Sequence, residues 1–239
     1  GHDVAVHDTI GCEGGTSCTV GLQGSVAEMK QAGVDVLFPT LNVLSLPGYV
    51  AEMVTQGFEP GDVQFYNSAF NAHSSEVVSS KVKAFGGEAA GALYDGAVVV
   101  DFAPTNNQFV ADWTTPAFTE LCNETYAAHG GERYDYFDPD GATKLGMLTV
   151  VCSEVRIMAR AIYDAGANPT HETIRTAIAQ LGPVDGNNSL PMSLGPGKYA
   201  AADVTQTSTW TSPCRIEGAA YDENDTCFVS DDNWETVAS

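Results

Sequence analysis

The stretch over residues 32–60 constrains the fold most, because it reads as one strand, one loop and one helix in succession. A short apolar run at residues 35–38 precedes Pro39, as expected for a buried parallel strand that a proline ends. A polar loop follows, and Pro47 then stands in the first turn of a helix that closes near Gly57. The sequence therefore predicts a strand followed by a helix, the repeating unit of a parallel α/β sheet.

The rest of the chain continues this alternation of short apolar strands and amphipathic helices. Further strands are expected at residues 4–6, 63–66, 97–102, 204–210 and 227–229. Helices are expected at residues 20–32, 76–86, 116–129, 142–166 and 173–181, the last of them capped by Thr170. We expect residues 87–92 to be a connection, residues 183–196 to be irregular, and the acidic tail to fray.

The longest expected helix carries apolar residues along one face. Its members recur at helical spacing and are Leu145, Leu148, Cys152, Val155, Met158, Ala159 and Ile162.

Polar side chains follow two neighbouring strands at the point where each strand ends. Thr40 and Asn42 come after the first strand, and Asn67, Ser68 and Phe70 come after the second. In an open α/β sheet, ligands bind outside the carboxyl ends of the strands. These five residues are therefore the candidate ligand-binding residues. The alternative interpretation is that they are ordinary loop residues that cap strands and helices.

The charge of the chain excludes some classes of partner. The 239 residues hold 31 acidic and 10 basic side chains, for a formal net charge of −21. Nucleic acids and anionic membranes are bound mainly by basic residues, so neither is an expected partner. No apolar run is long enough to span a bilayer. The acidity fits solubility, or a saline or extracellular habitat.

Six cysteines suggest an oxidising compartment. Taken in chain order, they form three pairs of successive cysteines: Cys12 and Cys18, Cys122 and Cys152, Cys214 and Cys227. Six cysteines allow 15 pairings, so the sequence alone leaves the connectivity open, although neighbour pairing is the simplest. Three disulfides are typical of the periplasm, the cell surface or secreted proteins. The absence of any CxxC spacing weakens zinc and redox interpretations.

Motifs for catalysis and metal binding are weak. The five histidines do not stand at metal-ligand spacing, and residues 138–141 (DPDG) lack the later glutamate of a calcium loop, which favours a turn. No nucleophile elbow or phosphate-binding loop occurs. A hydrolase would need Ser45, Ser68 or Asp101 near His73. We therefore expect neither an enzyme nor a cofactor or metal site.

The order and spacing of these pieces resemble a known family. The run "QAGVDVLFPTLN…LPGYVAEMVTQGFEPGDVQFYNSAF" is similar to the second lobe of type I periplasmic solute-binding proteins. The branch it resembles most is the branched-chain amino acid (Leu/Ile/Val) binding-protein family of ABC importers. Downstream, "AIYDAGANPTHETIRTAIAQLG" continues the resemblance, which extends over most of the chain.

The resemblance implies a flavodoxin-like α/β fold with a parallel sheet flanked by helices and an incomplete first lobe. Residues 1–102 would form the core of the second lobe. Residues 103–182 would be a helical segment that belongs to the first lobe or faces it. Residues 183–239 would return to the second lobe as strands and a disulfide loop. The chain would then be the carboxyl-terminal part of a longer protein.

The resemblance also implies a function. We expect an extracytoplasmic protein that captures a small polar or amino-acid-like molecule in an interlobe cleft and delivers it to the membrane permease of an ABC importer. A monomer is expected, in the periplasm or outside the cell, with a lipid anchor on an amino-terminal segment. The alternative is a sensory ligand-binding domain of a receptor with the same fold.

The ligand loop departs from the family in one respect. Amino-acid binders of the family place an acidic residue after the second strand, where it pairs with the ligand ammonium. Here no Asp or Glu occurs between Asp62 and Glu76. The neutral set, with Phe70, suits an amide, a hydroxylated compound or an aromatic acid, unless Asp95 or Asp101 supplies the charge.

Overall fold

The computed structural model describes residues 4–10, 21–69, 73–102, 106–109, 113–185, 191–198 and 201–237. The chain divides into two compact units. Unit 1 comprises Gly1–Asp101 with Thr207–Asp231, and unit 2 comprises Phe102–Gln206 with Asp232–Ser239. The polypeptide therefore passes between the units three times, after Asp101, Gln206 and Asp231.

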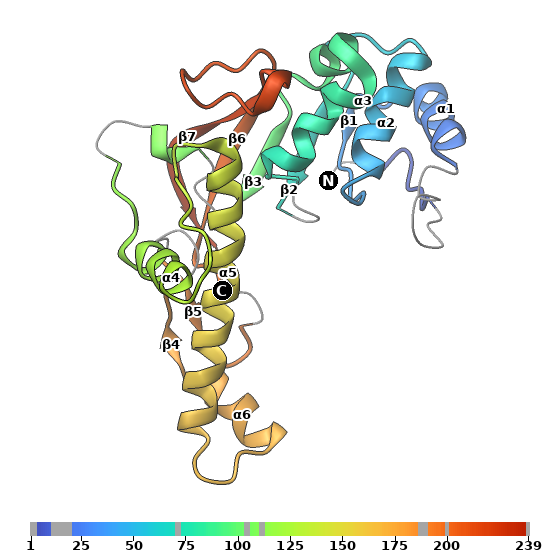
Figure 1. The fold of residues 1–239 in the computed structure, drawn as a ribbon. Coiled ribbons are helices and arrows are strands. Elements are labelled where there is room, and N and C mark those ends of the chain that lie inside the picture. Colours follow the sequence, from blue (N-terminus) through green and yellow to red (C-terminus); the bar gives the residue numbers. More distant parts are fainter. Residues whose placement is uncertain are drawn as a thin grey trace. The chain divides into compact units, whose positions relative to one another are not determined.

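Unit 1 is built on three parallel strands joined by helices, as the alternating pattern predicts (Figure 1). The strands are β1 (Val36–Leu37), β2 (Gln64–Ser68) and β3 (Val98–Asp101), and the helices are α1 (Leu22–Ala32), α2 (Ser45–Thr55) and α3 (Glu76–Tyr94). The register places Leu37 beside Phe65 and Asn67 beside Val99. Helix α2 connects β1 to β2 and helix α3 connects β2 to β3, and each returns the chain to the starting edge, which is the arrangement that parallel pairing requires.

The core of unit 1 lies between the three helices and one face of the sheet. Its fully buried members include Val26 of α1, Met53 of α2 and Val99 of β3. Removal of this apolar surface from water is the main stabilising contribution to such a unit. Tyr94 packs edge-on against both Phe65 and Trp210, at ring-centroid distances of 4.9 and 5.1 Å.

Two later strands complete the sheet, in the order β1-β2-β3-β6-β7. They are β6 (Val204–Thr211) and β7 (Cys227–Thr236), with the short 3₁₀ helix η4 (Asp222–Asn224) between them. Trp210 exchanges backbone hydrogen bonds with the residues that lead into β3: its N–H donates to the Ala97 carbonyl over 2.9 Å, and its carbonyl accepts from Gly96 over 3.0 Å. Residues far apart in sequence therefore share one ladder.

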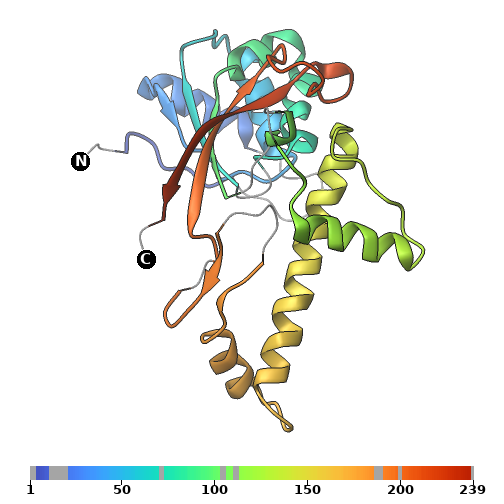
Figure 2. The same ribbon diagram turned by 90° about the vertical axis from the view of Figure 1, so that its left-hand side faces the viewer.

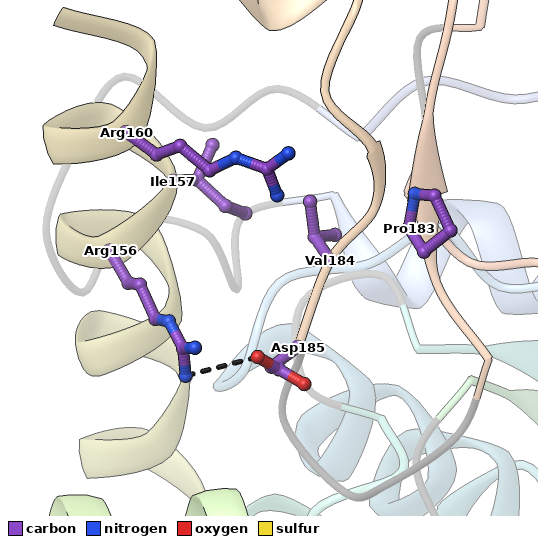
Figure 3. A pocket seen from close by; sticks show the side chains of 6 residues that line it. All are labelled: Arg156, Ile157, Arg160, Pro183, Val184 and Asp185. Carbon is purple, nitrogen blue, oxygen red and sulfur yellow. Dashed lines mark ion pairs between the residues drawn. The ribbon is translucent and has the colours of Figure 1, made fainter. Parts of the chain in front are cut away.

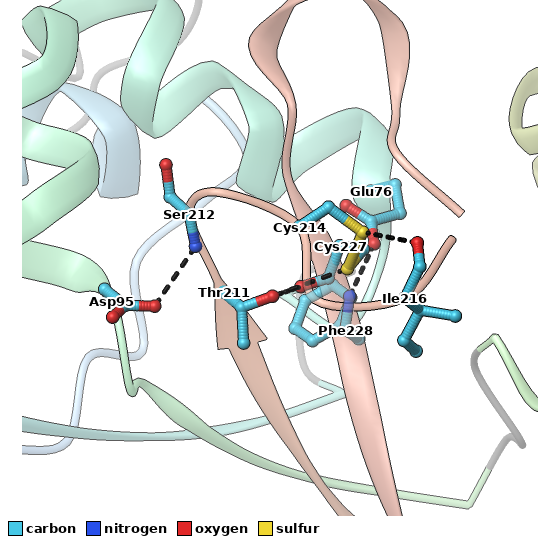
Figure 4. Close-up of a disulfide and its surroundings, with 8 residues drawn as sticks. All are labelled: Glu76, Asp95, Thr211, Ser212, Cys214, Ile216, Cys227 and Phe228. Carbon is cyan, nitrogen blue, oxygen red and sulfur yellow. Dashed lines mark hydrogen bonds between the residues drawn. A yellow bond between two sulfur atoms is a disulfide. The ribbon is translucent and has the colours of Figure 1, made fainter. Parts of the chain in front are cut away.

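A disulfide joins the ends of the loop between β6 and β7 (Figure 4). It links Cys214 to Cys227, which is completely buried. Beside it, the carboxylate of buried Glu76 accepts a hydrogen bond from the backbone N–H of Phe228 over 2.8 Å. The first residue of α3 is thereby bound to the start of β7.

Unit 2 is mainly helical in its described part. It contains η3 (Asn107–Phe109), α4 (Ala117–Ala128), α5 (Pro139–Asp164), α6 (His171–Ile178) and the two-residue strands β4 (Gly182–Pro183) and β5 (Ser193–Leu194), which pair antiparallel. Figure 2 shows α4 crossing beside the long helix α5, and the Cys122–Cys152 disulfide joins these two helices. Both described disulfides are neighbour pairs. Cys12 and Cys18 lie outside the described residues.

Helix boundaries in unit 2 follow local chemistry. Thr170 caps α6 as predicted: its hydroxyl accepts from the Thr173 N–H, and the Thr173 hydroxyl accepts in return from the Thr170 N–H. Asp138 of the DPDG run caps α5 by accepting from the Gly141 N–H over 3.2 Å, and Pro139 occupies the first helical position. The DPDG run, interpreted from the sequence as a turn, is therefore the amino-terminal cap and first residues of α5.

Three expectations were wrong. Residues 4–6 form no strand. Residues 87–92 continue α3 rather than connecting elements, because Gly87 (φ 69°) absorbs a kink between two helical stretches. The acidic tail extends β7 to Thr236, since backbone pairing outweighs the poor strand propensity of its Asp and Asn residues. The apolar face of α5 is only partly covered: Leu145 is buried, but Val155, Met158 and Ile162 are exposed.

None of the helices in the described residues combines the length and the apolar character needed to cross a membrane.

Candidate functional site

The carboxyl ends of β1, β2 and β3 meet at one edge of the unit 1 sheet. Because the three strands are parallel, their last residues, Leu37, Ser68 and Asp101, lie along this edge. Open parallel sheets bind ligands at such an edge, where loops can supply polar groups without interrupting the ladder. This edge is the candidate site.

Thr40 and Ser68 expose their side chains at the edge. Thr40 lies in the loop after β1, and Ser68 is the last residue of β2, paired in register with Val100. A hydroxyl can both donate and accept a hydrogen bond, so each can serve a neutral polar ligand. These two candidates combine an accessible polar atom with a position at the carboxyl edge.

Asn42 has a role in the fold. Its side-chain oxygen accepts hydrogen bonds from the backbone N–H groups of Leu44 and Ser45, over 3.0 and 2.9 Å. These are donors at the start of α2 that no helical carbonyl can satisfy. The alternative interpretation, a loop residue that caps a helix, therefore describes the side-chain oxygen of Asn42.

Asn67 points away from the open edge into the covered side of the sheet. It is only 6% exposed, and its register partner Val99 is completely buried. Its amide nitrogen donates to the Val98 carbonyl over 3.4 Å, whereas its side-chain oxygen has no hydrogen-bond partner among the described residues. An unpaired buried oxygen is costly, and Asn67 lies beside the buried Tyr94 side chain in the core.

Phe70 lies outside the described residues. Two other aromatic rings lie on the uncovered face of the sheet: Phe38, which follows β1, and Tyr66 of β2 stack with their centroids 5.5 Å apart. Phe38 is 70% exposed. The sequence signal for this pair is the alternation of side chains along each strand, which places both rings on the same face.

His73 connects the segment after β2 to the loop after β1, a role that no sequence pattern predicted. Its side chain is completely buried, and its Nε2 lies 2.7 Å from the Leu41 carbonyl oxygen in the loop after β1. Nδ1 has no partner among the described residues. Burial lowers the pKa of His73 below its ordinary value, and the contact with Leu41 opposes this only in part. A neutral ring that donates from Nε2 fits both observations.

Of the two aspartates considered for an ammonium group, only Asp101 lies at the correct edge. It ends β3 and is 3% exposed. Asp95 precedes β3 and therefore lies at the opposite edge. There its carboxylate accepts from the Ser212 N–H over 3.1 Å (Figure 4). The same carboxylate pairs with Arg215 over 2.7 Å. Asp95 thus organises the turn after β6.

A cavity of about 170 Å³ occurs in unit 2, beside the carboxyl-terminal half of α5 (Figure 3). Arg156 pairs with Asp185 over 3.0 Å, and Arg160 donates to the Leu181 carbonyl over 3.2 Å. Both guanidinium groups thus connect α5 to the segment that follows α6. These contacts account for the two arginines at the cavity without a bound ligand. In the described part of the chain, no three His, Cys, Asp or Glu side chains are grouped as a metal site.

Comparison with known proteins identifies the fold. No protein-family model matches the sequence, and no curated protein matches it. Among solved structures, the leucine-, isoleucine-, valine-, threonine- and alanine-binding protein from Brucella ovis, in its closed conformation, is similar with a TM-score of 0.51. The two sequences are 15% identical, and the match covers 90% of this chain and 46% of that one.

Two further solved structures are similar at lower scores. A fatty acid ABC transporter substrate-binding protein from Thermomonospora curvata gives a TM-score of 0.49 at 17% identity, over 87% of this chain and 46% of that one. An ABC transporter substrate-binding protein from Aeropyrum pernix gives 0.47 at 13% identity, over 84% and 50%. The similarity to the Brucella ovis structure shows that the chain has the α/β fold of type I periplasmic-binding proteins. The chain spans about half the length of the solved structures it matches.

Proposed function

We propose that this chain is the ligand-binding part of an extracytoplasmic solute-binding protein that serves the permease of an ABC importer. The observation that carries the proposal is the open carboxyl edge of a parallel sheet in a fold otherwise found in substrate-binding proteins. The disulfides Cys122–Cys152 and Cys214–Cys227 support an oxidising location, the periplasm or the cell exterior.

The ligand we propose is a small, polar or amino-acid-like molecule without net negative charge. Thr40 and Ser68 present hydroxyl groups at the edge, and buried Asp101 supplies a carboxylate there. A chain of net charge −21 repels anions over its whole surface. An amide, a polyol or a zwitterion fits this site, and Asp101 would bind the ammonium group if the ligand has one.

Binding can be tested by thermal unfolding of the 239-residue chain with amino acids, amides, polyols and aromatic acids. A ligand at about 100 times its dissociation constant stabilises a protein by about 2.7 kcal/mol. For a chain of this size, that is a rise on the order of 5 °C in the unfolding temperature. The proposal fails if no amino acid, amide or polyol raises it, and aromatic acids, which are anions, serve as the comparison that should not.

Variants locate the site. Thr40→Ala and Ser68→Ala should each weaken binding several-fold by removing a hydroxyl contact. Thr55→Ala is the matched control, since Thr55 is exposed in the same unit at the far end of α2. If Asp101→Asn abolishes the response to amino acids but keeps that to amides, the ligand carries an ammonium group. Equal effects at Thr55 and Thr40 would place the site elsewhere.

A sensory ligand-binding domain of a receptor is the second candidate, because the same edge would serve it equally well. The two functions predict different interaction partners for the loaded protein. Ligand-dependent stimulation of a reconstituted importer supports the first. The similar structures are binding proteins, so a catalytic role is not proposed.

A further inference from the structure

A buried imidazole connects the two segments that carry the candidate ligand-binding residues. The loop after β1 holds Thr40 and Asn42, and the segment after β2 passes through His73 into α3. Residues 38–42 belong to neither a strand nor a helix. The ladder of the sheet therefore does not set the course of this loop, and contacts from neighbouring segments have to do so.

Leu41 is the residue through which the loop after β1 is held. Its half-buried side chain packs against the core of unit 1, whereas the side chain of the preceding Thr40 is exposed. The Leu41 carbonyl oxygen lies 2.7 Å from Nε2 of His73. Both the side chain and the carbonyl of Leu41 are thus fixed, and together they orient the backbone from which Thr40 projects.

We propose that His73 is a positioning residue of the ligand site described above, and that its protonation releases the loop after β1, so that ligand is held at neutral pH and released in acid. His73 is completely buried, so it acts through Leu41 and touches no ligand itself. Ligand release rests on the proposed function, whereas the connection between ring and loop is a property of unit 1 alone.

The neutral form of the ring fits its surroundings, and the cation does not. A neutral imidazole protonated at Nε2 donates to the Leu41 carbonyl and leaves Nδ1 as an acceptor. In the cation Nδ1 becomes a donor, and it has no acceptor among the described residues. A buried charge without compensation is costly, and burial lowers the pKa of His73 although the Leu41 contact opposes this. The cation therefore favours a state in which the ring leaves its site and is hydrated.

Two buried carboxylates at the same edge of the sheet are the alternative sources of a pH response. The loop after β1 contributes none, since residues 38–45 hold no charged side chain. Helix α3 begins with Glu76, which is 5% exposed and accepts from the Phe228 N–H, and β3 ends with Asp101, which is 3% exposed. Neither is among the causes that shift the pKa of His73, which are burial and the Leu41 contact.

Nuclear magnetic resonance of the 239-residue chain without ligand tests the connection between ring and loop. Between pH 7.5 and pH 5, the amide signals of residues 40–44 should shift with the same midpoint as the His73 ring, and this midpoint should lie below the ordinary pKa of histidine. In His73→Gln, the side-chain amide can still donate to the Leu41 carbonyl but does not titrate. The loop signals of this variant should therefore stay at their neutral-pH positions.

Three control variants separate His73 from the other titrating groups. His129→Gln removes an exposed histidine, and Glu76→Gln and Asp101→Asn each remove one buried carboxylate. All three should keep the shift of the loop signals with the His73 midpoint. Circular dichroism at both pH values establishes that each variant is folded.

Calorimetric titration tests the consequence for binding, with the uncharged amide or polyol that gives the largest thermal shift. An uncharged compound excludes titration of the ligand itself. Its dissociation constant should rise about threefold or more between pH 7.5 and pH 5 in the unchanged chain and stay constant in His73→Gln. His73→Phe keeps a ring but loses the donor, so it should bind several-fold more weakly at both pH values.

Loop signals that do not follow the His73 ring, or that shift equally in His73→Gln, overturn the proposal whether or not a ligand is known. An affinity that is independent of pH while the loop follows the ring also overturns it, because the loop would then not govern binding. A thermal screen without any stabilising compound would instead overturn the proposed function, and the loop signals would still decide whether His73 controls the loop.

Discussion

Buried His73 places its Nε2 atom 2.7 Å from the carbonyl oxygen of Leu41, across 32 residues of sequence. The contact joins the segment after β2 to the loop after β1, the same loop that carries Thr40 and Asn42. The geometry of the candidate site therefore depends on one imidazole ring that need not touch a ligand.

Protonation of His73 should loosen the protein as the pH falls. The pKa of histidine is about 6.5 in an unfolded chain, and burial lowers the pKa of His73 in the folded state. The unfolded state then binds the proton first, so stability decreases as the pH falls from about 6.5 towards the lower folded pKa. In the cation, Nδ1 becomes a second buried donor, and it has no partner among the described residues.

Denaturant unfolding at pH 7.5 and pH 5 measures this effect. His73→Gln should lose less stability over this interval than the unchanged chain, while exposed His129→Gln serves as the control and should behave like the unchanged chain. At pH 7.5, His73→Ala should cost about 2–4 kcal/mol through the lost contact and the cavity it leaves. Identical pH dependence with and without His73 would refute the assignment.

Glu76 should matter far more than another acid on the same helix. Its carboxylate is 5% exposed and accepts from the Phe228 N–H at the start of β7. Glu76→Ala would leave that donor buried and unpaired, at a cost of about 2 kcal/mol, and Glu76→Gln should cost less because it keeps an acceptor. Glu88 pairs with Lys83 at the surface of α3 with its side chain 86% exposed, so Glu88→Ala should cost under about 0.5 kcal/mol. Urea unfolding compares the three variants, and equal costs at Glu76 and Glu88 would contradict the contact.

The Cys122–Cys152 disulfide should stabilise the helical unit by constraining its unfolded chain. The bridge spans 30 residues, and for such a loop the expected contribution is between about 3 and 4 kcal/mol. Cys122→Ala with Cys152→Ala should remove it, as measured by guanidinium unfolding without reductant. Adding a reductant to the unchanged chain should give a larger loss, because the reductant also breaks the Cys214–Cys227 disulfide. A doubly substituted chain as stable as the unchanged one would show that the bridge contributes nothing.

The start of α6 depends on Thr170. Thr170→Ala removes the hydroxyl that accepts from the Thr173 N–H and should cost about 1 kcal/mol, while Thr170→Ser should keep most of the stability. The rate of amide hydrogen exchange over His171–Ile178 measures fraying of this helix directly. Global unfolding is a weaker test, because fraying of one short helix need not change it. Unaltered exchange in Thr170→Ala would exclude a capping role.

Much of the fold could be predicted from local sequence patterns. The β1-α2-β2 unit follows from a buried apolar run, a proline and helical spacing, and the cap at Thr170 follows from its chemistry alone. Burial was less accessible to prediction. Periodicity identifies the apolar face of α5 through Val155, Met158 and Ile162, but only the tertiary structure shows that nothing described in unit 2 covers it.

The candidate site was predictable at the level of its edge and not of its individual side chains. Strand ends placed Thr40 and Ser68 correctly on parallel neighbours. Asn67 turns inward because alternate residues of β2 face opposite sides of the sheet. A shift of the strand register by one residue would exchange the inward and outward positions. His73 depends on a contact 32 residues away, for which no local pattern exists.

The three passages of the chain between its units have a consequence for dissection. Unit 1 is discontinuous in sequence, since Thr207–Asp231 contributes β6 and β7 residues to a sheet begun by Gly1–Asp101. A single protease cut within residues 102–206 would leave two fragments still paired through the bonds between Trp210 and Ala97. Expression of either unit as a separate domain would therefore require rejoining its segments with a linker.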